Sequence, residues 1–283
     1  MFKIPYGRHS VIQEDIDAVV NTLKSDFLTQ GPKVEEFESK FAQYIGSKYA
    51  VAVANGTAAL HLSILALGLE NGKKVITSPL TFVASANAVL YGGGEVDFCD
   101  IDPETLLLDI DLVREKLASS LKGTYCGIIP VDFAGAPVQM DAFRTLADEY
   151  GLWLLEDSCH APGGYFYDSL NHKQKCGNGS FADLAIFSFH PVKHIASGEG
   201  GMITTNNKEL YQKLLTLRSH GIVKEFDNSK EEKPGWYYEM QHLGFNYRLS
   251  DIACSLGISQ LKRIDENLKR RKEIAQRYDQ AFT

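Results

Sequence analysis

The sequence predicts an α/β protein with a largely parallel sheet and helices on both faces of that sheet. Three observations lead to this fold class. Short apolar runs typical of buried strands alternate with stretches of helical periodicity along most of the chain. Several of these strands end in glycine-rich or polar turns, where such sheets bind their ligands. The composition, 44% hydrophobic and 23% charged, is ordinary for a folded globular chain.

Two helices are expected first, before the alternation begins. The apolar residues that recur at helical spacing in the first helix are Ile12, Ile16, Val19, Val20 and Leu23. The second helix should begin at Pro32, a favourable first-turn residue, and end near Gly46. Its buried face would carry Val34, Phe37 and Phe41.

The alternating segments come next. The expected strands are residues 49–54, 75–77, 96–99, 127–133, 152–155, 185–189 and 202–205. The expected helices are residues 56–67, 82–90, 112–118, 140–150 and 208–218. Residues 171–180 and 224–235 are polar and predicted to be loops. From residue 249 to residue 283 the pattern predicts one long helical stretch.

Composition and charge disfavour several classes of partner. The formal net charge is −7 with no dense Lys/Arg tract, which disfavours a nucleic-acid partner. No apolar run approaches the roughly 20 residues that cross a bilayer, and residues 1–10 hold no apolar signal core, so neither membrane binding nor export is expected. The five cysteines form no CxxC pair, which favours reduced thiols in the cytoplasm and disfavours a zinc or other metal site.

The segment from Ser188 to Lys193 is the strongest chemical signal. A lysine follows a strand end, and a glycine-rich turn at residues 198–201 comes after it. A Schiff-base lysine needs such a place, because it must reach an aldehyde in a partly desolvated pocket where its amine can act as nucleophile and base. A lysine in an ordinary surface loop is the competing interpretation.

Asp157 follows another predicted strand and is followed by His160. A carboxylate at a strand end can hold the protonated pyridine nitrogen of pyridoxal 5'-phosphate (PLP). Strand alternation points Glu156 to the opposite face. His160 could contact the ring or its 3-hydroxyl group. The alternative is that Asp157 caps the next turn and that His160 is an ordinary buried imidazole.

Gly56, Thr57 and Ala58 stand where a strand passes into a helix. Small residues at a helix start let backbone N–H groups approach a phosphate. A tight turn with Thr57 as the helix cap has the same geometry. Phe82, near another strand end, could stack on a pyridine face or belong to the core. The GxxxxGK[ST], GxGxxG and GxSxG patterns are not found at these positions, which disfavours a P-loop protein, a dinucleotide-binding domain and a hydrolase.

Taken together, these segments resemble the DegT-type nucleotide-sugar aminotransferases, which are fold-type-I PLP enzymes. The matching segments are residues 28–32, 55–60, 81–87, 156–161, 188–193 and 244–249. The resemblance implies a PLP-binding large domain of the aspartate aminotransferase type over residues 1–250. Residues 251–283 would be a linking helix that leads to an absent or truncated C-terminal small domain.

The resemblance also implies a role for each matched residue. Lys193 would be the catalytic residue and carry PLP, and Asp157 would hold the pyridine nitrogen. The other cofactor-binding residues would be Gly56, Thr57, Ala58, Phe82, His160, Ser188 and Asn246. Asn246 would reach the phosphate of a neighbouring subunit, so the active unit would be a homodimer. The substrate site would be lined by Tyr6, Asp26, Phe27, Leu28, Thr29, Gly56, Ser188, Lys193 and Asn246.

The implied reaction moves an amino group from L-glutamate to C4 of a UDP-linked 4-keto-6-deoxy-N-acetylhexosamine, as in pseudaminic acid biosynthesis. His160 favours this branch of the family, because many relatives have glutamine there. Four alternatives stay open: another dTDP- or GDP-linked 4-keto or 3-keto sugar as substrate, a non-catalytic regulatory protein of the PLP fold, a PLP-dependent sugar dehydratase, and a plain nucleotide-binding domain. Lys193 disfavours the regulator, and also the dehydratase, in which histidine often replaces the lysine.

Overall fold

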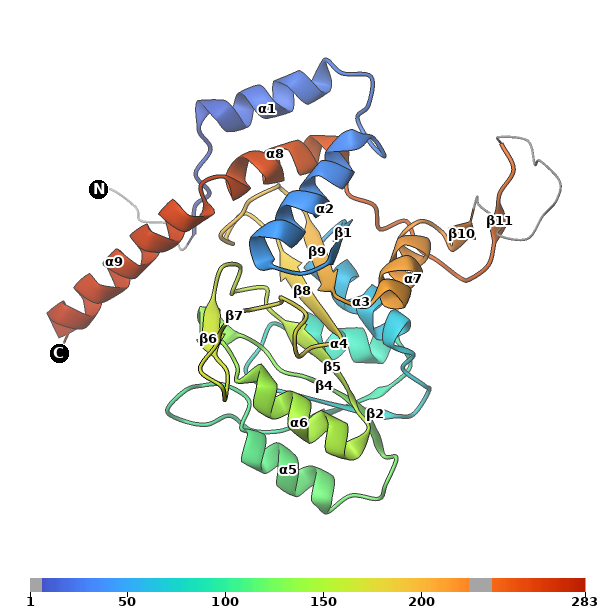
Figure 1. Cartoon of the computed structure of the whole chain (residues 1–283), viewed down its shortest axis with the longest axis vertical. Helices are drawn as coiled ribbons and strands as arrows, with labels where there is room; N and C mark the ends of the chain where they lie inside the picture. The colour runs from blue at the N-terminus through green and yellow to red at the C-terminus, as the bar shows by residue number, and fades with distance from the viewer. Residues whose placement is uncertain (1–6, 224–235, 283) are drawn as a thin grey trace.

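The computed structural model describes residues 7–223 and 236–282. The described helices are α1 (Gln13–Leu23), α2 (Pro32–Ile45), α3 (Gly56–Leu67), α4 (Ala84–Tyr91), α5 (Ile110–Ala118), α6 (Met140–Tyr150), α7 (Lys208–Arg218), α8 (Asp251–Leu261) and α9 (Ile264–Phe282). The described strands are β1 (Tyr49–Val53), β2 (Lys74–Thr77), β3 (Glu95–Phe98), β4 (Tyr125–Ile129), β5 (Trp153–Asp157), β6 (Tyr165–Tyr167), β7 (Lys173–Lys175), β8 (Leu184–Ser188), β9 (Gly201–Thr205), β10 (Ile222–Val223) and β11 (Glu239–Met240). Figure 1 shows their arrangement, with α9 projecting away from the body.

Within the described residues the central sheet has seven strands in the order β1-β9-β8-β5-β4-β2-β3. The pairings from β8 through β5, β4 and β2 to β3 are parallel. Strand β9 runs antiparallel to both of its neighbours, β1 and β8. The predicted α/β fold with a mostly parallel sheet is therefore confirmed.

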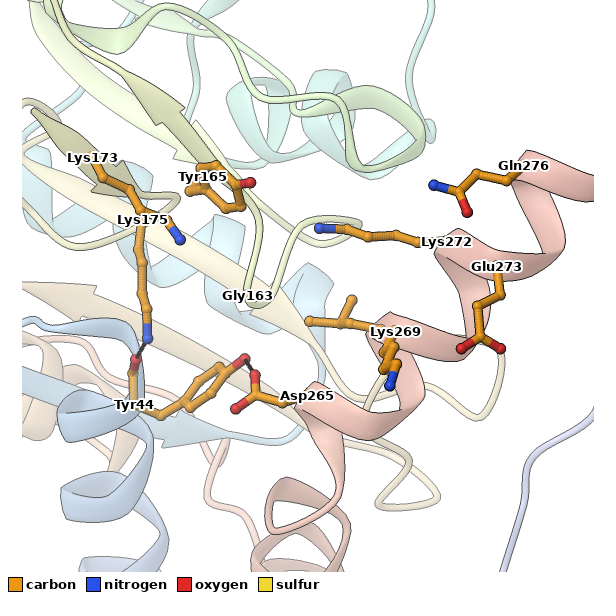
Figure 2. Close-up of a pocket in the computed structure, with 11 residues that line it drawn as sticks. Tyr44, Gly163, Tyr165, Lys173, Lys175, Asp265, Lys269, Lys272, Glu273 and Gln276 are labelled. Atoms are coloured by element: carbon orange, nitrogen blue, oxygen red, sulfur yellow. Dashed lines mark hydrogen bonds between the residues drawn. The ribbon is translucent and has the colours of Figure 1, made fainter. Parts of the chain in front are cut away.

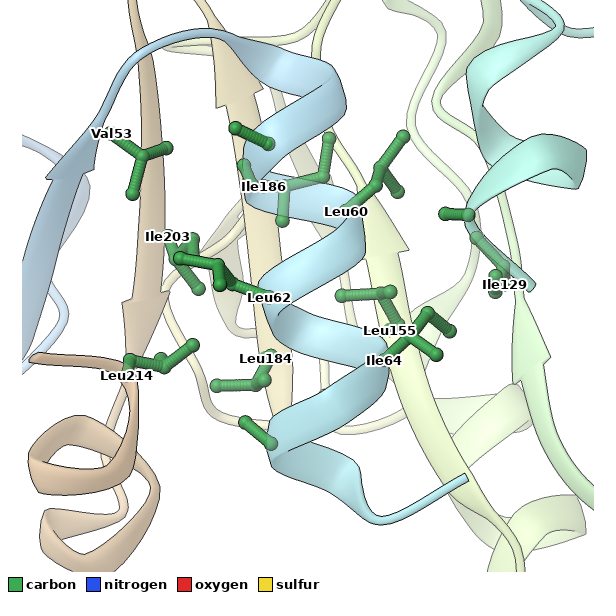
Figure 3. Close-up of a cluster of buried hydrophobic side chains, with 14 of the residues drawn as sticks. Val53, Leu60, Leu62, Ile64, Ile129, Leu155, Leu184, Ile186, Ile203 and Leu214 are labelled. Carbon is green, nitrogen blue, oxygen red and sulfur yellow. The ribbon is translucent and has the colours of Figure 1, made fainter. Parts of the chain in front are cut away.

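Helix α3 packs directly on the sheet and is buried nearly all round. Figure 3 shows Leu60, Leu62 and Ile64 of this helix beside side chains from the strands. The two faces of β8 separate as alternation requires: Ile186 belongs to the α3 cluster, whereas Phe187 lies in the cluster built with α2. Each such large apolar side chain contributes roughly 1.5–3 kcal/mol when fully buried, so α3 is fixed firmly against the strands.

The turn from β1 into α3 is set by Asn55 and Gly201. The Asn55 side chain accepts a hydrogen bond from the Ala58 N–H at 2.8 Å and so caps the helix. A Cβ at Gly201 would lie 2.5 Å from the Asn55 carbonyl oxygen, so a side chain there would collide with the backbone. Because β9 is reversed, its first residue meets the carboxyl ends of β1 and β8. Several strand ends therefore converge at the start of α3.

Three local predictions are wrong. The polar stretch at 171–180 is not all loop, because β7 pairs with β6 in a short hairpin. The helix expected at 82–90 begins at Ala84, which leaves Phe82 in the preceding turn. Strand β4 ends at Ile129, before Pro130, which has no N–H to donate to a sheet.

The long C-terminal helix is also corrected. It breaks after Leu261 into α8 and α9, because Arg263 turns inward and donates to the buried carboxylate of Asp15 at 2.7 Å. Gln260 donates to the same carboxylate oxygen at 2.7 Å. The predicted loop at 224–235 lies outside the described residues. In the part of the chain that is described, no helix combines the length and the apolar character needed to cross a bilayer.

Candidate active site

A cavity of about 650 Å³ opens where the strand ends converge. Its size is within the usual range for small-molecule sites. Of the predicted site residues, the cavity brings together Gly56, Thr57, Phe82, Asp157, His160, Ser188 and Lys193. Ala58 is buried one residue further into α3, and its N–H is the one capped by Asn55.

Asp157 is the last residue of β5, and its buried carboxylate is held from two sides. Ser85 in α4 donates its hydroxyl to Oδ2 at 2.8 Å. The Cys159 N–H donates to Oδ1 at 3.2 Å. The Ser85 hydroxyl is itself 2.9 Å from that of Thr81. One bond on each oxygen fixes the plane of the carboxylate and leaves further acceptor capacity for a donor in the cavity.

Sequence reasoning missed Ser85. It lies on a helix of small and apolar residues, and it is fully buried. A buried hydroxyl needs a hydrogen-bond partner. A serine on a helix of small and apolar residues could therefore have indicated a buried polar contact. The sequence did not show which partner it has, because Ser85 and Asp157 are separated by 72 positions.

Lys193 lies in the turn that follows β8. The Lys193 N–H donates to the His190 carbonyl at 2.8 Å, and the Ser197 N–H returns to Phe189 at 2.9 Å. These bonds close the loop and present Lys193 to the cavity opposite β5. Both groups are close enough to His160 to change its pKa: the charge of Lys193 lowers it, and the charge of Asp157 raises it. The amine and the carboxylate therefore share one small enclosure, which fits a group that needs a nucleophile and an anionic anchor.

The start of α3 supplies a different kind of surface to the cavity. A Cβ at Gly56 would lie 3.1 Å from Ser188 Cβ and 3.4 Å from the Cys159 sulfur. Glycine at this position avoids that crowding between the helix start and the end of β8. The first N–H groups of α3 and its dipole favour an anion. The Ser188 hydroxyl lines the same end. This donor set fits a phosphate group, and with Lys193 and Asp157 it fits PLP.

The orientation of the His160 ring is fixed by a turn after β4. The Ala134 N–H donates to His160 Nδ1 at 3.2 Å. Ala134 has a φ of +54°, a left-handed conformation that is uncommon for alanine. Burial, together with the charge of Lys193, lowers the pKa of His160. The ring is therefore neutral at pH 7, accepts at Nδ1, and carries its proton on Nε2 as a donor.

This assignment gives a spectroscopic prediction. In protein labelled with 15N-histidine, we expect the His160 resonances at pH 7 to be those of a neutral ring protonated on Nε2. The His160 resonances are identified as those that disappear from the spectrum of the His160→Gln variant. His190, exposed at the cavity rim, serves as the comparison ring. A cationic His160, or one protonated on Nδ1, would contradict the hydrogen bond from Ala134.

Behind Asp157, on the other side of β5, lies a buried group of Asp132, Glu156 and Cys176. Their ligand-type atoms are within 4.8 Å of one another. Asp132 accepts from the Ser158 hydroxyl at 2.7 Å, and Glu156 from the Gly177 N–H at 3.0 Å. Burial raises the pKa of both carboxyl groups; the charge of Asp157 adds to this at Asp132, and the charge of Asp132 adds to it at Glu156. This burial favours the neutral form of Glu156, which supports the strand end and does not line the cavity.

His194 makes stability depend on pH. Its Nδ1 is buried and has no hydrogen-bond partner among the described residues. Burial, and then the charge of Arg271, lowers the pKa of His194 to about 4. Below pH 6.5 the His194 side chain therefore takes up a proton in the unfolded chain but not in the folded chain. This difference lowers the free energy of unfolding as the pH falls towards 4.

We expect His194→Asn to remove that dependence. Relative to the wild-type protein, the variant should gain about 2 kcal/mol in free energy of unfolding between pH 7 and pH 5. Urea unfolding at the two pH values measures this difference. Other groups titrate equally in both proteins and cancel. Parallel loss of stability by both proteins would show that His194 titrates normally.

The remaining predicted residues do not line this cavity. Tyr6 lies outside the described residues. Asp26 and Phe27 line another cavity, of about 370 Å³, among α1, α2 and α8. The Leu28 carbonyl accepts from the Asp251 N–H at 3.0 Å. Backbone bridges pair Thr29 with Ser250 and Asn246 with Ser219. Their roles in binding substrate or cofactor stay predictions.

Comparison with known proteins agrees with this geometry. The model of the DegT/DnrJ/EryC1/StrS aminotransferase family matches residues 9–283. A UDP-4-amino-4,6-dideoxy-N-acetyl-beta-L-altrosamine transaminase of Campylobacter jejuni subsp. jejuni is 46% identical over 282 residues, which cover 99% of this chain and 69% of the relative. Both the family and the relative are named for amino transfer, as the resemblance implied.

Two solved structures are similar along the whole described fold. Helicobacter pylori PseC, an aminotransferase involved in the biosynthesis of pseudoaminic acid, has a TM-score of 0.87 and 32% identity, covering 100% of this chain and 71% of PseC. The PLP form of Spr1654, a sugar aminotransferase candidate from Streptococcus pneumoniae, has a TM-score of 0.85 and 29% identity, covering 99% of this chain and 72% of its own. The chain therefore belongs to the DegT/DnrJ/EryC1/StrS aminotransferase family.

Proposed function

We propose that this chain is a PLP-dependent aminotransferase that transfers the amino group of L-glutamate to C4 of a UDP-linked 4-keto-6-deoxy-N-acetylhexosamine. The products would be 2-oxoglutarate and the corresponding 4-amino sugar nucleotide. The observation that carries the proposal is the single cavity that Lys193 and Asp157 share with the start of α3. The name of the relative that is 46% identical supports the sugar and the UDP group.

In this proposal each residue of the cavity has a separate chemical role. When bound, PLP supplies an electron sink for breaking the Cα–H bond of the amino acid. Lys193 Nζ would meet the cofactor aldehyde and then carry a proton to and from the reacting carbon. Asp157 would hold a proton on the pyridine nitrogen. Ser188 and the N–H groups at Gly56 and Thr57 would bind the phosphate.

His160 and Phe82 complete the proposed cofactor site. His160 Nε2–H is a neutral donor that suits the oxygen substituent of the ring. Phe82 would stack on the ring face, although the residue is 68% exposed in a single chain. A second copy covering Phe82 would exclude water from the cavity, which strengthens the electrostatic interactions inside.

A homodimer also accounts for the residues that do not line the cavity. Asn246, Asp26, Phe27, Leu28 and Thr29 lie elsewhere on the surface of the chain. In a symmetric dimer a surface residue of one copy can complete the site of the other. We propose that Asn246 reaches the neighbouring phosphate and that residues 26–29 bind sugar nucleotide. The cysteines are all free, which supports a reducing, cytoplasmic setting for the reaction.

The proposal is tested by product analysis. The protein is incubated with PLP, 15N-labelled L-glutamate and a panel of UDP-, dTDP- and GDP-linked 4-keto-6-deoxy sugars. We expect the UDP-linked N-acetylhexosamine to gain labelled nitrogen at C4, as read by mass spectrometry and NMR. Product formed mainly from a dTDP or GDP sugar would replace the proposed substrate. Cofactor binding without any labelled product would refute the aminotransferase and favour a regulatory protein.

A further inference from the structure

A second cavity, of about 610 Å³, lies between the β6–β7 hairpin, the end of α2 and the first half of α9. Figure 2 shows that Lys173 and Lys175 reach it from the hairpin and that Lys272 reaches it from α9 on the opposite side. Lys269 of α9 also lines it. This lysine cleft shares no lining residue with the cavity around Lys193. Neither the proposed reaction nor the fold explains it.

Two of the lysine ammonium groups of the cleft lie at the same aromatic ring. Lys173 Nζ is 3.7 Å from the centroid of the Tyr165 ring, and Lys272 Nζ is 5.4 Å from the same centroid. A cation over a tyrosine ring gains about 0.5–1 kcal/mol at an exposed site. Two cations at one ring also repel each other, and an anion bound between them would relieve that repulsion.

The acidic groups of the cleft supply that negative charge only in part, because four lysines line the cleft and, among the described residues, only two carboxylates do, Asp265 and Glu273. The Asp265 carboxylate accepts the neutral hydroxyl of Tyr44 at 2.7 Å and lies beside α2. Glu273 is paired with Arg270 at 3.0 Å. None of the ion pairs found between described residues involves Lys173, Lys269 or Lys272.

The same cleft has a rigid floor. The Lys175 ammonium group donates to the backbone carbonyl oxygen of Tyr44 and lies 4.3 Å from the centroid of the Tyr44 ring. Burial, followed by the bond to Asp265, raises the pKa of Tyr44, so its hydroxyl remains a donor. Lys175 and Tyr44 thus join the hairpin to α2, while Lys173, Lys269 and Lys272 stay available for a ligand.

We propose that the lysine cleft is a second binding site for a phosphate-bearing anion, with Lys173 and Lys272 as its main contacts. Ammonium groups on two elements, facing one cavity, suit a ligand that carries several negative oxygens. Inorganic pyrophosphate represents this class better than phosphate, because it offers more charge to the lysines on both sides.

Calorimetric titration of the PLP-loaded protein with pyrophosphate tests the proposal. We expect saturable binding that weakens as salt is added, and weaker binding of inorganic phosphate. Lys173→Ala/Lys272→Ala should reduce the affinity for pyrophosphate by about tenfold or more. Lys122→Ala/Lys208→Ala is the matched control, since it removes the same charge from two exposed lysines away from the cleft.

The outcomes separate this site from the active site. The Lys173/Lys272 variant should keep its rate of amino transfer when no added anion is present. Equal pyrophosphate affinity in the two double variants would overturn the proposal and assign the binding to another site, such as the cavity around Lys193. Absence of pyrophosphate binding at millimolar concentration would also overturn it, and would leave Tyr165 as a ring covered by two lysine side chains.

Discussion

Lys193→Ala is expected to lower glutamate-dependent amino transfer by about 10⁴-fold or more. The substitution removes the cavity amine that would act as nucleophile and as proton carrier, and loss of positioned proton transfer alone costs about 10²–10⁴-fold. The measurement is the single-turnover rate of 2-oxoglutarate formation with cofactor and L-glutamate in excess.

Lys193→Arg separates the amine's chemistry from its charge. A guanidinium group keeps the positive charge next to His160 and Cys159 but remains protonated at working pH. We therefore expect the arginine variant to be as inactive as the alanine variant. Substantial activity in either variant would exclude Lys193 as the reacting amine.

Asp157→Asn should have the next largest effect, a fall of about 10²–10³-fold in the same rate. An amide cannot balance the positive charge of a protonated pyridine nitrogen, and one lost preorganised electrostatic partner costs this much in other enzymes. Asparagine has nearly the shape of aspartate: its amide oxygen can still accept from the Cys159 N–H, and its NH2 group can donate to the Ser85 hydroxyl, which reverses that bond but keeps the contact. The absorption spectrum of bound cofactor should change together with the rate.

Glu156→Gln is the matched control for that experiment. Glu156 precedes Asp157 on the same strand and is equally buried, but it faces Asp132 and Cys176. Because burial raises the pKa of Glu156, glutamine resembles its protonated form. We expect the rate of amino transfer of the Glu156→Gln variant to stay within about threefold of the wild-type rate, since the contacts around residue 156 change little. Equal losses in both variants would mean that Asp157 acts through the fold.

Several features were predictable because each depends on local sequence. The Pro32 start and Gly46 stop of α2 follow from local backbone preferences, and the structure has both. The apolar runs predicted strands at 152–155 and 185–189, within two residues of the observed ends at Asp157 and Ser188, and parallel strands bring such ends to one edge. The cavity around Lys193 follows from that topology.

Other features depend on contacts between distant segments, which periodicity does not contain. The break between α8 and α9 needs Asp15, nearly 250 positions away from its partner Arg263. Strand β7 has the sequence Lys-Gln-Lys, which shows no apolar alternation, and it is defined by its pairing with β6. The tautomer of His160 depends on a left-handed Ala134, a conformation that alanine rarely adopts.

The central claim is that the Lys193 amine joins the cofactor across the cavity from Asp157. Borohydride reduction of the PLP-loaded protein, followed by digestion and peptide mass spectrometry, tests it most directly. We predict a stable pyridoxyl modification on the peptide that carries Lys193, and none on the peptides of Lys173 or Lys272. Modification of a different lysine, or recovery of unmodified Lys193 peptide from fully loaded protein, would contradict the claim.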